Sequence, residues 1–330
     1  EILITAIPEI PGPLDKAYIV IDLIIVSIKI KYIYFSMIIW IASYPKSGNT
    51  WLRAIISQLL LVDPSQKNDV LKDINKIKSY PLPRNFEGLS KKFKDDGDYE
   101  DKIEVIKNWI KSQELLNTDN KYKLLKTHNM LCKLNFNNNE NHSFTDLDNT
   151  AGAIYIVRDP RNLVSSIKYH YSLESLDASF QMMQNEGMWI KGKIRGRYAS
   201  VPQIISSWDA HFESWNRFPK QILIVKYEDL IKDTKFEVIK IIKYLNKFFD
   251  ININNDQIET IIKNCSFSNL QSQEKLSGFS ESVFDKKTGK NKNFFNIGPN
   301  RKWEDNLDRD LTKKIENRFG PIMQKLNYIS

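Results

Sequence analysis

Short apolar runs alternate with amphipathic stretches along most of the chain. Residues 38–43 (IIWIAS) form a nearly continuous apolar run, which is typical of a strand buried on both faces. The next segment repeats apolar side chains at helical spacing, at Leu52, Ile55, Ile56, Leu59 and Leu60. Further apolar runs predict strands over 122–127, 153–158 and 221–227, while 160–171, 201–217 and 235–248 predict helices. This alternation indicates an α/β fold with a central, mostly parallel sheet flanked by helices.

Two internal regions carry a weaker pattern. Residues 63–118 are polar and weakly helical, and residues 134–142 (LNFNNNENH) are predicted to be a polar loop between two strands. No internal repeat interrupts the α/β pattern, so residues 37–330 are predicted to form a single domain.

The first 36 residues have a different composition. Their apolar stretch is broken by Asp22, Lys29 and Lys31, so its uncharged segments are shorter than the roughly 20 residues of a membrane span. Neither a basic start nor a small-residue cleavage site marks a signal peptide. Because Met37 directly precedes the first strand, we interpret residues 1–36 as an upstream extension outside the native protein, with a membrane anchor as the alternative.

The formal charge of +8 indicates an anionic partner, such as a nucleic acid, a membrane surface or a phosphorylated small molecule. The basic residues are scattered and are not interleaved with aromatic residues as in a nucleic-acid module, so a nucleic-acid partner is not expected. The two cysteines, Cys132 and Cys265, provide neither a disulfide framework nor zinc spacing. We therefore expect a reducing, cytoplasmic location and no metal.

The sequence SYPKSGNTW, residues 43–51, follows the first strand and resembles a phosphate-binding loop. Pro45 and Gly48 favour a tight turn, and Asn49 or Thr50 can cap the following helix. Backbone N–H groups at a helix start bind anions, and Lys46 adds a charge. An ordinary strand–turn–helix is the alternative. The lysine precedes the glycine, whereas a Walker loop has the reverse order.

Two further polar clusters follow predicted strands. His128 and Lys126 lie at the end of one strand, where strand alternation places both side chains on the same face. A histidine with a pKa near neutrality can accept a proton from a hydroxyl, although an ordinary surface histidine would look the same. Arg158 leaves the next strand and Ser166 follows two helical turns later, while Asp159 and Arg161 are equally consistent with a capping pair.

Together these clusters resemble the sulfotransferases that use 3′-phosphoadenosine 5′-phosphosulfate. The family's 5′-phosphosulfate loop PKSGTTW is matched by PKSGNTW, its KTH by residues 126–128, and its 3′-phosphate arginine and serine by Arg158 and Ser166. The family's YED matches Tyr227, Glu228 and Asp229, and its SF, which lies on the adenine side of the donor, matches Ser266 and Phe267. The resemblance extends from Ile38 to about Leu307 and implies the P-loop-like sulfotransferase fold.

One loop departs from the family pattern. The family sequence is roughly RKGxxGxW, and here Gly298 and Trp303 are kept while Asn296 and Ile297 replace the arginine and lysine. Arg301 and Lys302 are the nearby basic residues that we expect to supply the missing charge.

The resemblance implies transfer of a sulfonyl group to an acceptor hydroxyl or amine, without a metal ion. His128 would be the general base, Lys46 would stabilise the leaving phosphate at its bridging oxygen, and Lys126 would help to hold the transferring group or that oxygen. The donor would contact Lys46, Ser47, Gly48, Asn49, Thr50, Trp51, Arg158, Ser166, Tyr227, Ser266, Phe267, Gly298, Arg301 and Lys302.

The acceptor is predicted only as a class. Residues 63–118 and 172–200 are expected to build its pocket, and their mixture of methionines and basic residues suits a small molecule, a lipid or a carbohydrate. The sequence leaves a homodimer open. Alternative functions are a P-loop nucleotide kinase and a non-catalytic nucleotide-binding relative.

Overall fold

A computed structural model provides the structure, and it describes residues 37–60, 69–93, 100–136, 140–192, 199–285, 289–296, 298 and 302–330. The interpretation of residues 1–36 and the predicted contacts of Ile297 and Arg301 lie outside the described residues.

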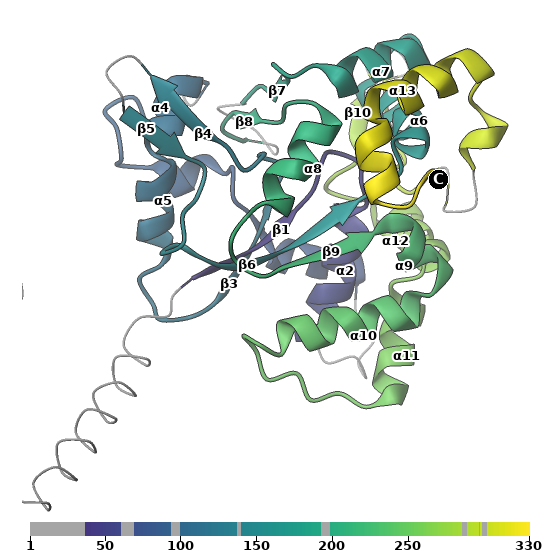
Figure 1. Cartoon of the computed structure of the whole chain (residues 1–330). Helices are drawn as coiled ribbons and strands as arrows, with labels where there is room; N and C mark the ends of the chain where they lie inside the picture. Colours follow the sequence, from purple (N-terminus) through teal and green to yellow (C-terminus); the bar gives the residue numbers. More distant parts are fainter. Residues whose placement is uncertain are drawn as a thin grey trace, which may run out of the picture.

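A parallel sheet of five strands forms the centre of the molecule (Figure 1). The strands are β1 (Ile38–Ala42), β2 (Lys78–Ser79), β3 (Lys123–Thr127), β6 (Thr150–Val157) and β9 (Ile222–Lys226), in the spatial order β2-β3-β1-β6-β9. Each neighbouring pair is parallel. All four strands predicted from the apolar runs are present, and the predicted α/β fold class is confirmed.

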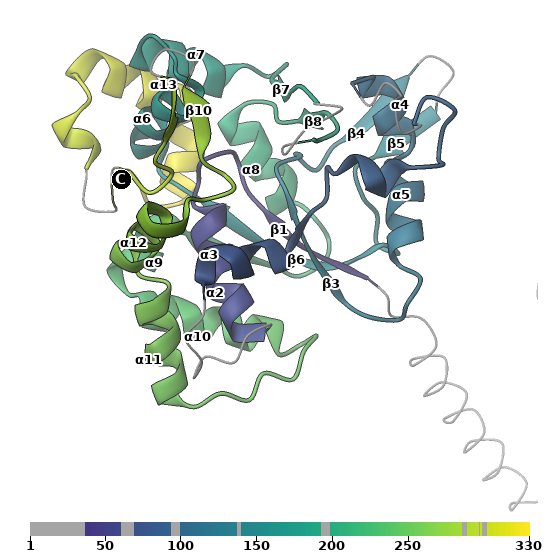
Figure 2. The ribbon, with the colours of Figure 1, turned by 180° about the vertical axis from the view of Figure 1, so that it is seen from behind.

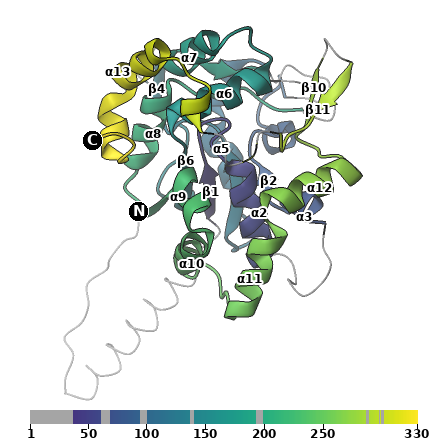
Figure 3. The same cartoon turned by 90° about the vertical axis from the view of Figure 1, so that its right-hand side faces the viewer.

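Helices cover both faces of this sheet, as Figures 1 and 3 show. Ile39 and Ile41 of β1 pack with one layer, which consists of α2 (Asn49–Leu60), α3 (Val70–Asp73), α10 (Thr234–Leu245), α11 (Asn255–Asn264) and α12 (Phe267–Ser277). Trp40 packs with the other layer, which consists of α4 (Lys102–Lys107), α5 (Trp109–Leu116), α6 (Pro160–Tyr171), α7 (Leu176–Gln184), α8 (Trp208–Asn216) and α13 (Arg309–Lys325). A strand buried on both faces needs an unbroken apolar sequence, which explains the IIWIA run.

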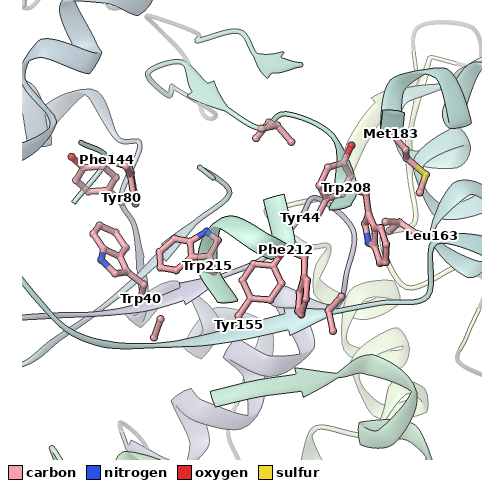
Figure 4. Packing of buried hydrophobic residues seen from close by; sticks show 14 of the residues in the cluster. Trp40, Tyr44, Tyr80, Phe144, Tyr155, Leu163, Met183, Trp208, Phe212 and Trp215 are labelled. Carbon is pink, nitrogen blue, oxygen red and sulfur yellow. The ribbon is translucent and has the colours of Figure 1, made fainter. Parts of the chain in front are cut away.

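Aromatic side chains dominate the second layer (Figure 4). The ring of Trp40 lies 5.1 Å from that of Tyr80 and 5.1 Å from that of Phe144. The indole N–H of Trp40 donates to Thr150 Oγ1 at 2.9 Å, so its polar atom is also satisfied. Rings of this size bury about 150–250 Å² each, which makes this cluster a large part of the hydrophobic stabilisation beneath the site.

Two of the local predictions are wrong. The predicted helix 201–217 is confined to α8, because Pro202 disfavours helical backbone at Val201 and residues Gln203–Ile204 instead form β8, paired with β7 (Trp189–Ile190). The predicted polar loop 134–142 contains an antiparallel hairpin of β4 (Lys133–Phe136) and β5 (Glu140–Ser143). Strands with few apolar residues carry no hydrophobic signal, so the sequence pattern missed this pair.

Shorter elements complete the described fold. Helix α9 (Tyr227–Lys232) follows β9 directly, and β10 (Val283–Asp285) pairs with β11 (Lys290–Lys292) in an antiparallel hairpin. Figures 2 and 3 show this hairpin above α12, and Figure 3 shows it at the edge of the molecule. Three 3₁₀ turns cover Ile74–Lys76, Pro83–Phe86 and Trp303–Asp305.

Across the described residues, no helix has the length and apolar character that crossing a membrane requires.

Candidate functional site

Four parallel strands deliver the predicted site residues to one edge of the sheet. Ala42, at the end of β1, is in register with Thr127 of β3 and Tyr155 of β6. Residues 43–48 therefore continue beside His128 and Arg158, while Tyr227 follows the end of β9. Ligands of open parallel sheets bind at such carboxyl ends. The topology therefore places site residues that are far apart in the sequence next to one another where a ligand is expected.

The phosphate loop makes a sharp turn between β1 and α2. Lys46 and Gly48 have positive φ values of 69° and 105°. A Cβ atom at Gly48 would lie 2.5 Å from Tyr227 Cδ2, so only glycine fits against that ring. The carbonyl of Gly48 accepts the N–H of Leu52 at 3.1 Å and thereby starts the helix. The first N–H groups of α2 consequently point away from the helix body, as an anion site requires.

Asn49 and Thr50 do not cap this helix, which corrects the sequence prediction. The Asn49 amide donates to Ile41 O at 3.2 Å and to Ser43 Oγ at 3.3 Å, so it ties the loop back to β1. Its Oδ1 accepts from Arg53 Nε at 3.0 Å. The Thr50 hydroxyl donates to a carboxylate oxygen of Glu281 at 2.7 Å.

His128 is held in one tautomer. Its Nδ1 lies 2.8 Å from the carbonyl oxygen of Ser43, and because a carbonyl only accepts, Nδ1 carries the proton. In the neutral ring, Nε2 is then the basic atom. Burial lowers the pKa of His128 well below its ordinary value, the positive charge of Lys126 lowers it further, and the Ser43 hydrogen bond opposes both.

The backbone around His128 is also fixed. Its N–H donates to Gln203 Oε1 at 3.1 Å, and its carbonyl oxygen accepts from His211 Nε2 at 3.0 Å. The other ring nitrogen of His211 lies 2.8 Å from the hydroxyl of Tyr155. Burial lowers the pKa of His211 to about 4, so this buried histidine is a neutral structural residue.

Lys46 and Lys126 are two of the cations of the site. Burial lowers the pKa of Lys46 to about 8; the charges of Arg158 and Lys126 lower it further, whereas Glu281 raises it. Burial also lowers the pKa of Lys126 to about 8, with Arg53 acting in the same direction and Glu281 opposing. The Lys46 ammonium lies 3.9 Å from the ring centroid of Phe294.

Arg158 approaches the loop from β6. Its guanidinium carbon lies 4.4 Å from the ring centroid of Tyr227, and Nη1 donates to Lys46 O at 3.5 Å. Trp51 contacts the same tyrosine, with 5.7 Å between the ring centroids, and donates its N–H to Cys265 O at 2.9 Å. Tyr227 therefore supports Gly48, Trp51 and Arg158 at once. Ser166 lies half-buried on α6.

The predicted adenine-side residues lie at the start of α12. Ser266 caps this helix by accepting the N–H of Asn269 at 3.4 Å. The ring of Phe267 lies 5.9 Å from that of Phe295, and a Cβ at Gly298 would lie 3.4 Å from Phe267 Cε1. Lys302 is exposed just before the turn Trp303–Asp305, and no described contact joins it to the phosphate loop.

Glu228 of the YED sequence, together with Asp159 and Arg161, holds helices in place by hydrogen bonds and an ion pair within the protein. Glu228 accepts the N–H of Asp159 at 3.1 Å and the hydroxyl of Tyr328 at 3.0 Å. Asp159 caps α6 and pairs with Arg161, with 2.7 Å between Oδ2 and Nη2, as the capping interpretation predicts. The guanidinium of Arg161 also lies 4.3 Å from the Trp303 ring, which explains why a tryptophan stands at that position.

Sequence reasoning missed several residues of this region. Arg53 is buried in α2 and pairs with Glu281, although a charged residue among apolar helix positions is itself a signal that could have been followed. Glu281 and Phe294 carry no such signal, because only folding brings them to the loop. Ser43 contacts His128 Nδ1 through its backbone carbonyl, which any residue type would provide, and its hydroxyl lies 3.2 Å from the same atom.

The fold and this site define an α/β protein of the P-loop-like class, with a cluster of basic side chains and a buried histidine beside a helix start. A family model described as the sulfotransferase domain matches residues 37–327. The chain therefore belongs to the sulfotransferase family and is a sulfotransferase by class.

Relatives of known type support this assignment over most of the chain. Sulfotransferase 1B1 of Canis lupus familiaris is 25% identical over 277 residues, which cover 80% of each protein. Cytosolic sulfotransferase 12 of Arabidopsis thaliana is 24% identical over 278 residues, covering 82% of this chain and 73% of that protein. The fold is shared with the crystal structure of mouse sulfotransferase SULT7A1 complexed with PAP, at a TM-score of 0.52 and 19% identity over 88% of this chain and 85% of that one.

Proposed function

We propose that the protein transfers the sulfonyl group of 3′-phosphoadenosine 5′-phosphosulfate to a hydroxyl or amine of a small-molecule, lipid or carbohydrate acceptor. The observation that carries the proposal is the position of His128. Its Nδ1–H is held by the Ser43 carbonyl, which leaves Nε2 as a base beside Lys126 and next to the phosphate loop. Family membership favours this chemistry over the kinase alternative.

Two buried polar atoms support a doubly anionic donor. Among the described residues, neither Ser47 Oγ nor Arg158 Nε has a hydrogen-bond partner, although both atoms are buried. An unsatisfied buried donor is costly, and a bound anion would remove that cost. The two atoms belong to the residues that the family resemblance assigns to the 5′-phosphate and the 3′-phosphate. The residues present thus fit the donor, with Lys46 and the N–H groups of the α2 start adding positive potential.

In the proposed mechanism, the donor supplies an activated sulfonyl group and leaves as adenosine 3′,5′-bisphosphate. His128 Nε2 accepts the proton of the acceptor hydroxyl or amine. Lys46 stabilises the negative charge that develops on the leaving phosphate oxygen, and Lys126 holds the transferring group. The lowered pKa of His128 keeps its ring unprotonated at neutral pH, as a base must be.

The acceptor pocket is proposed next to this base, between the regions 63–118 and 172–200. The basic run at 193–198 lies outside the described residues. Met183 packs in the core with Trp208, as Figure 4 shows, so it is a structural residue of this wall. Met182 and Met188 are only partly buried, which leaves flexible apolar side chains for contact with an apolar acceptor.

We also propose that residues 37–330 form one sulfotransferase domain and that the protein is cytoplasmic. The family match ends at residue 327, close to the end of the chain. Cys132 and Cys265 are both free thiols, as expected in a reducing compartment.

A ligand-binding experiment tests the donor. Adenosine 3′,5′-bisphosphate is expected to raise the melting temperature, because a ligand at about 100 times its Kd stabilises the folded state by about 2.7 kcal/mol. ATP with magnesium is expected to have a much smaller effect. Stabilisation by ATP alone would contradict the proposal.

A transfer assay with labelled donor and an acceptor panel tests the base. His128→Asn is expected to lower kcat by about 10²-fold or more while the Kd for adenosine 3′,5′-bisphosphate stays the same. If His128→Asn kept near-normal turnover, the assignment of the base would be wrong. If it lost donor binding instead, His128 would be a structural residue.

A further inference from the structure

We propose that Glu281 is a resident competitor of the donor, whose carboxylate occupies the Thr50 hydroxyl that the donor's 5′-phosphosulfate needs and places a negative charge beside the cations of the site. The inference rests on the proposed donor and goes beyond it, because it assigns a role to an acidic residue in a site for anions. Glu281 lies between α12 and β10, on a segment that contacts the start of α2.

The carboxylate of Glu281 is bound at both oxygens. Oε2 accepts from the Thr50 hydroxyl at 2.7 Å, and Oε1 forms an ion pair with Arg53. Burial alone would raise the pKa of Glu281, but the charges of Arg53 and Lys126 and the two hydrogen bonds lower it to about 2. The group is therefore a full negative charge at any physiological pH, next to the cations of the site.

A donor anion and this carboxylate need the same partners. The Thr50 hydroxyl has one proton, so while it donates to Glu281 it cannot donate to a phosphate. Glu281 also raises the pKa of Lys46 and of Lys126, which places its charge within electrostatic reach of both lysines. Two anions sharing these cations repel each other, so donor binding requires Glu281 to withdraw from Thr50.

The position of Glu281 is fixed by the fold and is not that of a free surface side chain. Glu274 of α12 is buried and accepts from Ser282 Oγ at 2.6 Å, directly after Glu281. It also accepts the N–H groups of Phe294 and Phe295 at 2.7 Å and 2.9 Å. One buried carboxylate thus holds both Glu281 against Thr50 and the Phe294 ring against Lys46.

A carboxylate among clustered basic side chains changes their electrostatic energy when no donor is bound. Lys46, Lys126, Arg53 and Arg158 are clustered, and the pKa values of the two lysines are lowered by burial and by their neighbours. Glu281 offsets that repulsion while no donor is bound. Its return would also compete with the bisphosphate product, so the same residue lowers donor affinity and favours product release.

Calorimetric titration of adenosine 3′,5′-bisphosphate tests the inference. Glu281→Gln keeps the shape of the side chain and removes its charge, and it is expected to tighten binding by about tenfold or more, because like-charge contacts in a site are costly. Glu259→Gln is the matched control. Glu259 lies on α11 in an exposed ion pair with Lys235 of α10, so this change removes the same charge and is expected to leave the Kd unchanged.

A second ligand separates the two phosphate subsites. Adenosine 3′-monophosphate lacks the 5′-phosphate, so its Kd is expected to be the same for wild type and Glu281→Gln. Equal or weaker binding of the bisphosphate by Glu281→Gln overturns the inference, as does equal tightening of both ligands. If neither wild type nor Glu281→Gln binds the bisphosphate, the proposed donor itself is wrong.

Glu281→Gln removes the charge that pairs with the buried Arg53 and is expected to lower the folding stability. A separate comparison therefore controls for this loss. Arg53→Met and the double variant Arg53→Met with Glu281→Gln form the second comparison. The double variant is expected to bind the bisphosphate about tenfold or more tightly than Arg53→Met alone. No gain in this pair would overturn the inference even if Glu281→Gln alone did not fold.

Discussion

At the scale of single residues, Gly48 shows how closely the phosphate loop is packed. A Cβ atom there would lie 2.5 Å from the Tyr227 ring, at a φ of +105°. Gly88 provides a matched control, since it also has a positive φ, of +75°, but a Cβ atom there would have no neighbour within 4 Å.

We expect Gly48→Ala to lower the free energy of unfolding by about 2–4 kcal/mol, because backbone strain and overpacking add. Gly88→Ala is expected to cost only about 1–2 kcal/mol from strain alone. Urea denaturation measures both. Equal costs for the two variants would show that the Tyr227 contact does not constrain the loop.

The pKa values of the site predict its pH dependence. In the proposed mechanism His128 acts as an unprotonated base, and because its pKa is lowered, activity is expected to be lost only when the pH falls well below the ordinary pKa of histidine. Lys46 and Lys126 must be charged, and their charge is lost as the pH rises through about 8. The profile of kcat/KM for the donor, which reports the free enzyme, is therefore expected to be flat from about pH 6 to 7 and to fall as the pH rises through about 8.

Lys46→Arg tests the alkaline limb of that profile. Arginine stays charged beyond pH 12 in roughly all protein environments, so only Lys126 would still titrate and the fall above pH 8 should become less steep. An alkaline limb of unchanged steepness would mean that Lys46 does not contribute to it.

The residues of the site differ in how far sequence could predict them. His128 and Lys46 belong to short motifs at strand ends, so their location follows from the local pattern. The tautomer of His128 does not, since it depends on the Ser43 carbonyl 85 positions earlier in the chain. The capping prediction for Asn49 failed because its amide reaches back to β1 in the folded loop.

At the scale of elements, Arg161 joins α6 to the C-terminal helix α13. It pairs with Asp159 on its own helix, with Glu316 of α13 at 2.7 Å and with the carbonyl oxygen of Tyr328 at 2.8 Å. Asp159 and Arg161 are both largely buried, at 4% and 7% exposure. Removing the guanidinium therefore leaves a buried carboxylate without a cation, with only its capping hydrogen bond from the backbone N–H of residue 161.

Arg161→Ala is expected to lower the free energy of unfolding by about 3–5 kcal/mol, as for other broken buried ion pairs. Arg217→Ala is the control, because Arg217 pairs with Glu213 at 3.0 Å while its own side chain is 79% exposed. That change is expected to cost no more than about 1 kcal/mol. Chemical denaturation of both variants makes the comparison, and similar losses would contradict the structural role of Arg161.

The helices and strands that carry strong periodicity were predictable, and the weakly patterned ones were not. The apolar runs of β1 and β6 are buried on both faces, so burial and sequence agree. Strands β4 and β5 have few apolar residues, and only their antiparallel pairing with each other identifies them as strands. Residues 201–207 look apolar enough for a helix, but Pro202 and the pairing of β8 with β7 prevent one.

At the scale of the whole molecule, the family match begins at residue 37, immediately before β1. A chain that starts at Met37 is therefore expected to fold, to melt within about 2 °C of the full chain and to bind adenosine 3′,5′-bisphosphate with the same Kd, since about 1 kcal/mol corresponds to about 2–4 °C for a large domain. Differential scanning calorimetry and calorimetric titration of the two proteins make the test. A lower melting temperature or weaker binding would show that the domain extends upstream of Met37.

Sequence by itself determined the α/β class, the sulfotransferase resemblance and the strand ends that carry Lys46, His128 and Arg158, because these depend on local periodicity and short motifs. Only the tertiary structure decided which acidic side chain lies beside those basic groups. The ion pair between Arg53 and Glu281 joins residues 228 positions apart. Its existence depends on where the segment before β10 packs, and that position is set by the buried Glu274. Long-range packing of this kind leaves no periodic signal in the chain. The Glu281 carboxylate beside the basic side chains is therefore visible only in the folded protein.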